Sequence, residues 1–219
     1  PILYEDELLV AFDKPAGLLV APDRWDKLRD NLMDQVHAVQ PHWFNAHRLD
    51  RDTSGVLVCA KSPAVLRLLC TAFETHRVRK RYLALLHGVP EPAAQLVDLP
   101  LAPDPARPGR MHVLVGGKPA QTELRVQQRW PHYALVELLP LTGRSHQLRV
   151  HCATIGHPLV ADPFYGDPQR PGLATLARTA LHAQRVELAH PGHQQRLCIE
   201  APLPDDFVRT LAELGAPSA

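Results

Sequence analysis

Hydrophobic and polar positions alternate along some stretches of the chain and form blocks in others. Residues 3–12 alternate, which predicts a strand or hairpin that stops at the Lys-Pro-Ala-Gly run of residues 14–17. Residues 55–60 are continuously apolar, a pattern typical of a buried strand. Further strands are predicted over residues 82–87, 122–128, 133–139, 181–188 and 196–200.

Four other segments have the spacing or the end signals of helices. Residues 26–39 carry spaced apolar positions, and Ser62-Pro63 is typical of an N-cap followed by proline in the first turn, which predicts a helix to about His76. A helix over residues 145–155 is expected to end at Gly156, and a last helix is expected over residues 205–214. A Pro-, Gly- and Arg-rich loop is expected over residues 102–117.

Strands arrive in pairs with helices between them at irregular intervals. This order predicts an α+β fold in which a mixed, mostly antiparallel sheet is flanked by helices. No repeat or linker-like segment divides the chain, so a single domain over residues 1–219 is expected.

Composition narrows the class of protein. The chain is 45% hydrophobic and 21% charged, as in ordinary globular proteins, and its net charge of +1 excludes binding to nucleic acid by bulk positive charge. Arginine outnumbers lysine among the 24 basic residues, and arginine suits phosphate contacts. The four cysteines lie far apart, which favours reduced thiols in a cytoplasmic protein, and no apolar run predicts a membrane span or a signal peptide.

The segment 47–55, with the sequence His-Arg-Leu-Asp-Arg-Asp-Thr-Ser-Gly, is densely polar and directly precedes the apolar strand. So many polar residues cannot all be buried in a core, so they are expected to line a loop at the edge of the sheet. Loops held by a rigid strand commonly display catalytic groups, which makes Asp50 a candidate. A solvated turn whose Asp and Thr side chains cap backbone groups is the alternative.

Two later segments carry clustered cations. Residues 77–82 read Arg-Val-Arg-Lys-Arg-Tyr, a basic strip followed by an aromatic, which fits phosphate binding beside a base or, alternatively, a helix C-terminus that complements the dipole. Residues 142–151 place Arg149 one turn into the expected helix, where its guanidinium could form a forked pair with a carboxylate from another loop. Arg144 and His146 could instead be capping or surface residues, and the spacing of His146 and His151 argues against a metal site.

Together these three segments resemble the motifs of the RluA family of pseudouridine synthases, over nearly the whole chain. The resemblance implies a pseudouridine synthase fold with a central catalytic cleft, and a cofactor-free isomerase that converts uridine in RNA to pseudouridine. It implies that Asp50 attacks the target nucleoside, with Arg149 as its ion-pair partner and Tyr82 against the uracil ring. The further substrate-binding residues that we expect on this basis are Arg48, Leu148, Arg144, Arg79 and Lys80. Among them, Arg48 is expected to fill the space that the flipped base leaves, and Leu148 to form part of the apolar pocket wall.

The resemblance is to small members of the family that lack an appended S4-type RNA-binding domain, on the evidence of residues 96–101 and 117–123. It implies action on a large-subunit (23S) ribosomal RNA loop, a tRNA anticodon stem-loop or both. A monomer is expected because it fits a cleft that must admit folded RNA, and no protein partner is implied. One departure is Ala161, in the run Ala-Asp-Pro-Phe-Tyr-Gly of residues 161–166, where the family usually has glycine. This change is expected to affect a structural turn more than the chemistry.

Two other functions compete with this interpretation. A non-catalytic RNA-binding protein would explain the arginines, but not an aspartate among cations, where it would repel phosphate. A hydrolase could use Asp50, Ser54 and a histidine, but no Gly-x-Ser-x-Gly elbow is present to expose a serine.

Overall fold

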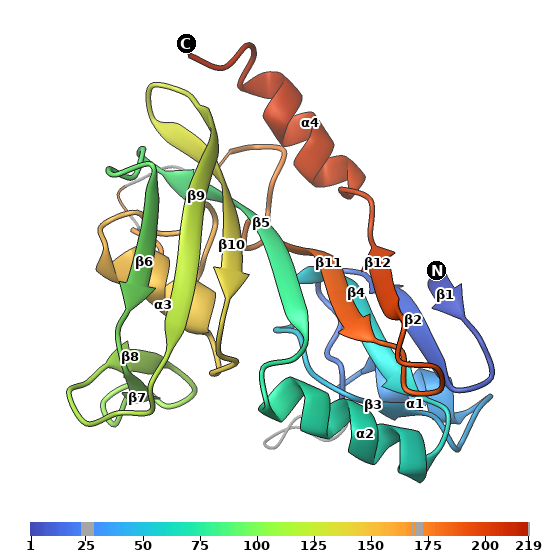
Figure 1. Cartoon of the computed structure of the whole chain (residues 1–219). Coiled ribbons are helices and arrows are strands. Elements are labelled where there is room, and N and C mark those ends of the chain that lie inside the picture. Colours follow the sequence, from blue (N-terminus) through green and yellow to red (C-terminus); the bar gives the residue numbers. More distant parts are fainter. Residues whose placement is uncertain (23–28, 168, 170–172, 219) are drawn as a thin grey trace. The chain divides into compact units, whose positions relative to one another are not determined.

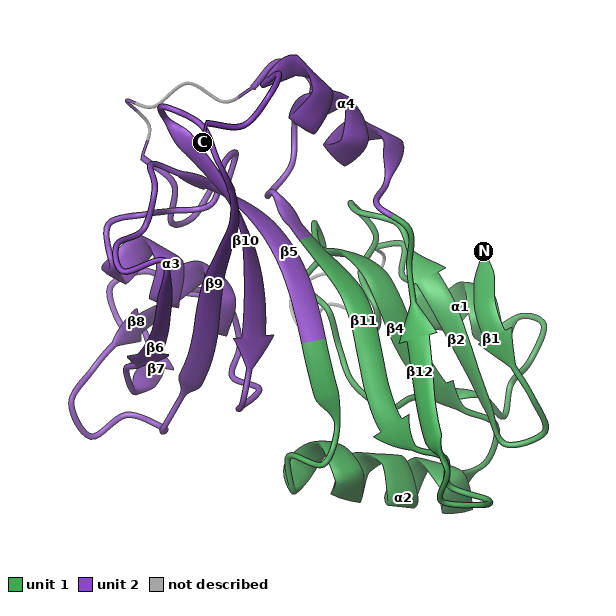
Figure 2. Cartoon of the chain, turned by 45° about the horizontal axis from the view of Figure 1, so that its top comes forward, with its two compact units in different colours: residues 1–80, 182–202 green, residues 81–181, 203–219 purple. Residues whose placement is uncertain are grey.

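The computed structural model describes residues 1–22, 29–167, 169 and 173–218. These residues form two compact units, each built from two separate stretches of chain (Figure 2). Unit 1 comprises residues 1–80 and 182–202, and unit 2 comprises residues 81–181 and 203–219. The expectation of a single catalytic domain over residues 1–219 stays a prediction.

Unit 1 is a sheet in the order β1-β2-β4-β11, with β12 added on β11 and β3 on β4. All its strand pairs are antiparallel except β4 with β11, which run parallel. Its elements are β1 (Ile2–Glu5), β2 (Leu9–Lys14), α1 (Leu32–His37), β3 (Phe44–Asn45), β4 (Ser54–Ala60), α2 (Pro63–Glu74), β11 (Leu181–Ala189) and β12 (Arg196–Glu200).

The core of unit 1 lies between the sheet and α2, which Figure 1 shows beside β3 and β4. Every residue of β4 is buried, as its continuous apolar pattern predicted. Val65 and Leu69 of α2 pack in the same cluster as Val56 and Val58 of β4. Helix α2 begins as predicted, because the Ser62 side chain accepts a hydrogen bond from the Val65 N–H at 3.3 Å.

Gly55 allows β4 and β11 to approach closely. Its φ is +111°, a backbone conformation that side chains rarely adopt, and a Cβ atom there would collide with the backbone of Ala183. The last residue of the segment 47–55 is therefore fixed by packing between strands.

Unit 2 contains the antiparallel strands β5-β10-β9-β6 and a separate two-stranded sheet of β7 and β8. The boundary between the units falls within β5, after Lys80. The elements are β5 (Arg79–His87), β6 (Ala94–Asp98), β7 (Leu101–Pro103), β8 (Met111–Val113), β9 (Gln121–Arg129), β10 (Tyr133–Pro140), α3 (Gln147–Thr154) and α4 (Asp205–Glu213).

Apolar clusters pack the helices of unit 2 against its strands. Leu148 and Cys152 of α3 pack against Val136 and Leu138 of β10. Phe207 of α4 is fully buried in a second cluster with residues of β5 and β10. The α+β class and the mostly antiparallel sheets agree with the sequence prediction.

Some element boundaries differ from those predicted. The described part of the helix expected over residues 26–39 is α1, which begins after Asn31, whose side chain accepts the Asp34 N–H; residues 26–28 lie outside the described residues. The loop expected over residues 102–117 contains most of the β7–β8 pair, and strand β6 was missed. Helix α3 begins two residues later than expected, because His146 has a left-handed conformation with φ of +52°.

Candidate active site

Asp50 lies in unit 1, on the loop between β3 and β4, and is half-buried. The loop is fixed at both sides of this residue. Leu49 is buried, and the Thr53 N–H donates to the Asp50 carbonyl oxygen at 3.1 Å. The segment is therefore a tight turn held against a buried strand, which is a suitable support for a catalytic group.

Lys14 anchors the same loop from the end of β2. Its side chain is fully buried, and Nζ donates to the carbonyl oxygens of Pro15 at 2.7 Å, Leu18 at 2.7 Å and Arg51 at 3.0 Å. The Gly17 N–H also donates to the Arg51 carbonyl oxygen, at 2.9 Å. The run 14–17, which the sequence marked only as a strand end, thus fixes the backbone next to Asp50.

His47 anchors the start of the segment. Its Nε2 accepts the Val58 N–H of β4 at 3.0 Å, and its ring stacks on Phe73 of α2 with centroids 4.6 Å apart. Burial, reinforced by the charge of Lys80, lowers the pKa of His47 to about 3. His47 is therefore neutral near pH 7 and acts as a fixed hydrogen-bond acceptor.

The other candidates of unit 1 are cationic. Arg48, Arg77 and Arg79 are exposed, and no carboxylate pairs with them among the described residues. Lys80 is half-buried, and burial lowers its pKa to about 8. The side chains of the basic strip thus differ in setting, although they are adjacent in sequence.

Arg149 lies in the first turn of α3 in unit 2 and is buried. Its Nε and Nη2 donate to the two carboxylate oxygens of Asp162 at 2.7 and 2.8 Å, a forked pair. Burial alone would raise the pKa of the Asp162 carboxyl. The hydrogen bonds and charge of Arg149, together with two backbone N–H groups, outweigh this effect, so the pKa of Asp162 lies below its usual value. The Arg149–Asp50 pair expected from the sequence joins residues of different units and stays a prediction.

Sequence reasoning missed Asp162 as the partner of Arg149. Its Oδ1 also accepts the N–H groups of Phe164 at 2.9 Å and Tyr165 at 3.1 Å. Ala161 just before it has φ of +56°, a conformation that favours glycine. The departure at residue 161 therefore does fall in a structural turn, and this turn supplies the counter-ion of a candidate catalytic residue.

Tyr82 and Leu148 belong to one cluster. Tyr82 of β5 pairs with Leu138 of β10 and is partly buried against the cluster that contains Leu148. Leu148 is buried, as expected of an apolar wall. Arg144 is half-buried, and its Nε donates to the Pro119 carbonyl oxygen at 3.0 Å.

Gln147 fixes the loop that leads into α3. Its Oε1 accepts from Thr142 Oγ1 at 2.8 Å and from the Arg144 N–H at 3.0 Å, and its Nε2 donates to the Gln121 carbonyl oxygen at 2.9 Å. The side chain is buried, so this network attaches the loop rigidly to β9.

In the part of the chain that the structure describes, no three His, Cys, Asp or Glu side chains are grouped so that they could hold a metal ion. None of the described helices is both long and apolar enough to cross a membrane.

Solved structures with this fold define the class of protein. A structure of human RNA Pseudouridylate Synthase Domain Containing 4 superposes with a TM-score of 0.79 at 30% identity, over 97% of this chain and 92% of that one. Human RNA Pseudouridylate Synthase Domain Containing 1 also gives a TM-score of 0.79, at 29% identity, over 99% of this chain and 88% of that one. The fold is that of the RNA-modifying isomerases.

The sequence itself narrows the class further. Residues 8–154 match the family model described as RNA pseudouridylate synthase, and the chain belongs to this family. It is 41% identical over 203 residues to the dual-specificity RNA pseudouridine synthase RluA of Escherichia coli (strain K12), covering 92% of each chain. It is also 41% identical over 221 residues to the ribosomal large subunit pseudouridine synthase D of Nitrosomonas europaea, covering 96% of this chain and 64% of that one. The resemblance drawn from three motifs is confirmed, and the protein is an RNA pseudouridine synthase, an isomerase.

Proposed function

We propose that the enzyme converts specific uridines to pseudouridine in stem-loop RNA, with Asp50 as the nucleophile. The observation that carries this assignment is the fixed turn around Asp50: Lys14 binds the Arg51 carbonyl oxygen, His47 binds the backbone of β4, and Leu49 is buried. A carboxylate must be held in place to react, and a rigid backbone supplies that.

The remaining residues are proposed to serve this step. Arg149, oriented by Asp162, supplies a fixed guanidinium for an ion pair with the nucleophile, and Tyr82 and Leu148 form the wall beside the uracil ring. Extrusion of a stacked base costs a few kcal/mol, so something must fill the vacated space. Arg48, exposed two residues before Asp50, is suited to that because a flat cation can stack and contact phosphate. Arg79, Lys80 and Arg144 are proposed to bind phosphates.

The substrates are proposed to be a loop of large-subunit (23S) ribosomal RNA, a tRNA anticodon stem-loop or both. Support comes from two relatives, one a dual-specificity RNA pseudouridine synthase and the other a ribosomal large subunit pseudouridine synthase. Mapping pseudouridines in rRNA and tRNA of a strain that lacks this protein would identify the sites. A monomer is proposed because a folded RNA must reach Asp50, and sedimentation of the protein alone and with RNA tests this. A cytoplasmic location is proposed because the four cysteines are free thiols, which suits a reducing compartment.

Release of tritium from RNA labelled at uracil C5 tests the reaction, because the new glycosidic bond forms at C5 and displaces that hydrogen. The wild-type enzyme should release tritium, and Asp50→Asn should release none above background. Release by Asp50→Asn at the wild-type rate would exclude Asp50 as the nucleophile. No release by the wild type, together with tight RNA binding, would favour a non-catalytic RNA-binding protein.

A further inference from the structure

Phe164 of unit 2 is an aromatic side chain held at the surface. Its residue is 40% exposed, in the turn that follows Asp162. Single exposed hydrophobic residues are common on proteins and need no explanation; Val208 of α4 is 49% exposed, for example. The surroundings of Phe164, rather than its exposure, mark it as a binding residue.

The turn that carries Phe164 is attached to two elements. The Tyr165 hydroxyl accepts the Met111 N–H of β8 at 2.8 Å and is 2.8 Å from Nδ1 of His146. Phe164 itself donates its N–H to Asp162. An aromatic ring on such a fixed support loses little entropy when a ligand stacks on it.

Cations lie beside this ring. The guanidinium carbon of Arg110 is 4.9 Å from the ring centroid, and Nη1 donates to the Phe164 carbonyl oxygen at 2.6 Å. The guanidinium carbon of Arg149 is 5.3 Å from the centroid. Asp162 balances the charge of Arg149, whereas among the described residues no carboxylate pairs with Arg110 or Arg144.

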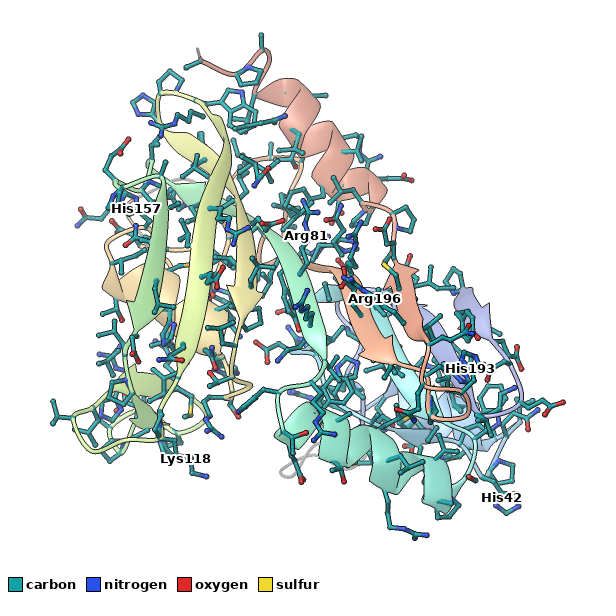
Figure 3. The ribbon with its side chains drawn as sticks, in the orientation of Figure 1. His42, Arg81, Lys118, His157, His193 and Arg196 are labelled. Atoms are coloured by element: carbon teal, nitrogen blue, oxygen red, sulfur yellow. The ribbon has the colours of Figure 1, made fainter. Side chains whose placement is uncertain are left out.

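Two arginines of β9 in unit 2 are, by contrast, balanced by carboxylates. Arg125 pairs with Glu123 at 2.7 Å, and Arg129 pairs with Glu91 at 2.7 Å. The uncompensated cations Arg110 and Arg144 thus contrast with them. Lys118, which projects from the chain near the β7–β8 pair in Figure 3, is exposed and also has no carboxylate partner among the described residues. The charge of Arg110, which no carboxylate among the described residues balances, lies directly beside the ring and suits an anionic ligand.

An exposed aromatic ring on a rigid turn, flanked by uncompensated arginine, has the chemistry of a stacking platform for single-stranded nucleic acid. We propose that Phe164 stacks an unpaired base next to the target uridine in the RNA, while Arg110 contacts the adjoining phosphate. This proposal rests on the proposed function, in which Arg149 acts in catalysis, because the ring lies beside Arg149.

The stacking proposal can be tested by measuring how tightly an unmodified anticodon stem-loop transcript binds. The proteins compared are the wild type, Phe164→Leu and Phe164→Trp. Leucine keeps the apolar contacts but cannot stack, so Phe164→Leu should bind about 5- to 150-fold more weakly. Phe164→Trp should bind within about threefold of the wild type, and its added fluorescence should be quenched by the RNA. Val208→Ala, an exposed position outside the turn, should bind as the wild type does.

Fluorescence anisotropy with the stem-loop and with a blunt RNA duplex of equal length gives the second readout. The loss in Phe164→Leu should appear for the stem-loop and not for the duplex, and its thermal melting should match the wild type. Wild-type affinity in Phe164→Leu, equal losses on both RNAs, or no quenching in Phe164→Trp would overturn the proposal. Tritium release by the wild type is measured separately. If the wild type releases no tritium, the proposed function is wrong. If it releases tritium but Phe164→Leu binds RNA as tightly as the wild type, only the stacking proposal is wrong.

Discussion

Two turns of this protein each carry an aspartate near cations in the sequence, and the two aspartates differ in burial. In the turn 161–166 the carboxylate of Asp162 is buried, and it accepts a forked pair from Arg149 and two backbone N–H groups. In the segment 47–55, Lys14 Nζ and the Thr53 N–H donate hydrogen bonds to backbone carbonyl oxygens of the turn. Asp50 itself is only half-buried. One turn uses its carboxylate as a structural counter-ion. In the other turn the backbone is fixed, and we propose that the Asp50 carboxylate is the group that reacts.

The comparison also separates two kinds of arginine. Arg149 is buried and oriented by a carboxylate, whereas Arg77 and Arg79 are exposed. A fixed guanidinium suits an ordered catalytic pair, and an exposed one suits diffuse attraction to phosphate. These roles predict different responses to mutation.

Apart from replacement of Asp50 itself, the largest effect is expected for Arg149→Met. Turnover in the tritium-release assay should fall by a factor of at least about 100, as when an electrostatic donor is removed from an active site, while RNA affinity changes by less than about threefold. Arg149→Lys, which keeps the charge but lacks the fork, should recover only part of the loss. Equal losses of turnover and of RNA affinity would mean that Arg149 contacts RNA.

A smaller loss of activity is expected for Asp162→Asn. The amide keeps the shape of the turn but removes the charge that orients Arg149, so turnover should fall about 10-fold or more. The free energy of unfolding should also fall, by roughly 3 kcal/mol, because a buried guanidinium loses its counter-ion. Urea unfolding measures the second effect. A variant that is destabilised but fully active per folded molecule would show that Asp162 only stabilises the turn.

His47 is expected to make stability depend on pH. Its folded pKa of about 3 lies below the ordinary value of 6.5, so the unfolded chain binds the proton more readily between these values. Its contribution is therefore complete above pH 6.5 and is lost, at up to about 1.4 kcal/mol per pH unit, as the pH falls toward 3.

His47→Gln provides the comparison, since glutamine can accept the Val58 N–H but does not titrate. Urea unfolding of both proteins between pH 7 and pH 4.5 should show a steeper loss for the wild type. Parallel curves would show that His47 is not held neutral in the folded state.

The smallest effects are expected for Arg77→Ala and Arg79→Ala. Each should weaken RNA binding a few-fold and reduce the slope of log affinity against log salt by about 0.7 to 0.9, the release expected for one phosphate contact. Arg129→Ala removes an exposed arginine that is already paired with Glu91 and should leave the slope unchanged. If Arg77→Ala and Arg79→Ala keep the wild-type slope of log affinity against log salt, as Arg129→Ala should, the basic strip is not part of the RNA-binding surface.

Much of the fold could be predicted from local patterns. The continuous apolar run of β4 and the Ser62-Pro63 start of α2 are signals contained within a few residues, and both were read correctly. The start of α3 was placed too early because the left-handed turn at His146 depends on tertiary contacts, among them its hydrogen bond to Tyr165. The β7–β8 pair was missed because its strands are only three residues long and are embedded in Pro- and Gly-rich sequence.

The candidate site shows the same limit. Asp50, Tyr82 and Arg149 stand in short motifs that the sequence displays directly. The partner of Arg149 is 13 residues further along the chain, in a turn that composition alone marks as structural. The three hydrogen bonds of the buried Lys14 amine could not be predicted from the sequence either, because a lysine is normally expected to be exposed.

We propose that Asp50 reacts and that Asp162 serves only as a counter-ion. The most direct test of this proposal is single-turnover tritium release at saturating RNA, with Asp50→Asn and Asp162→Asn measured side by side. Asp50→Asn should bind RNA with near wild-type affinity and release no tritium above background, whereas Asp162→Asn should react slowly and to completion. A measurable rate for Asp50→Asn together with an inactive Asp162→Asn would contradict the account, because it would place the reacting carboxylate in the turn 161–166.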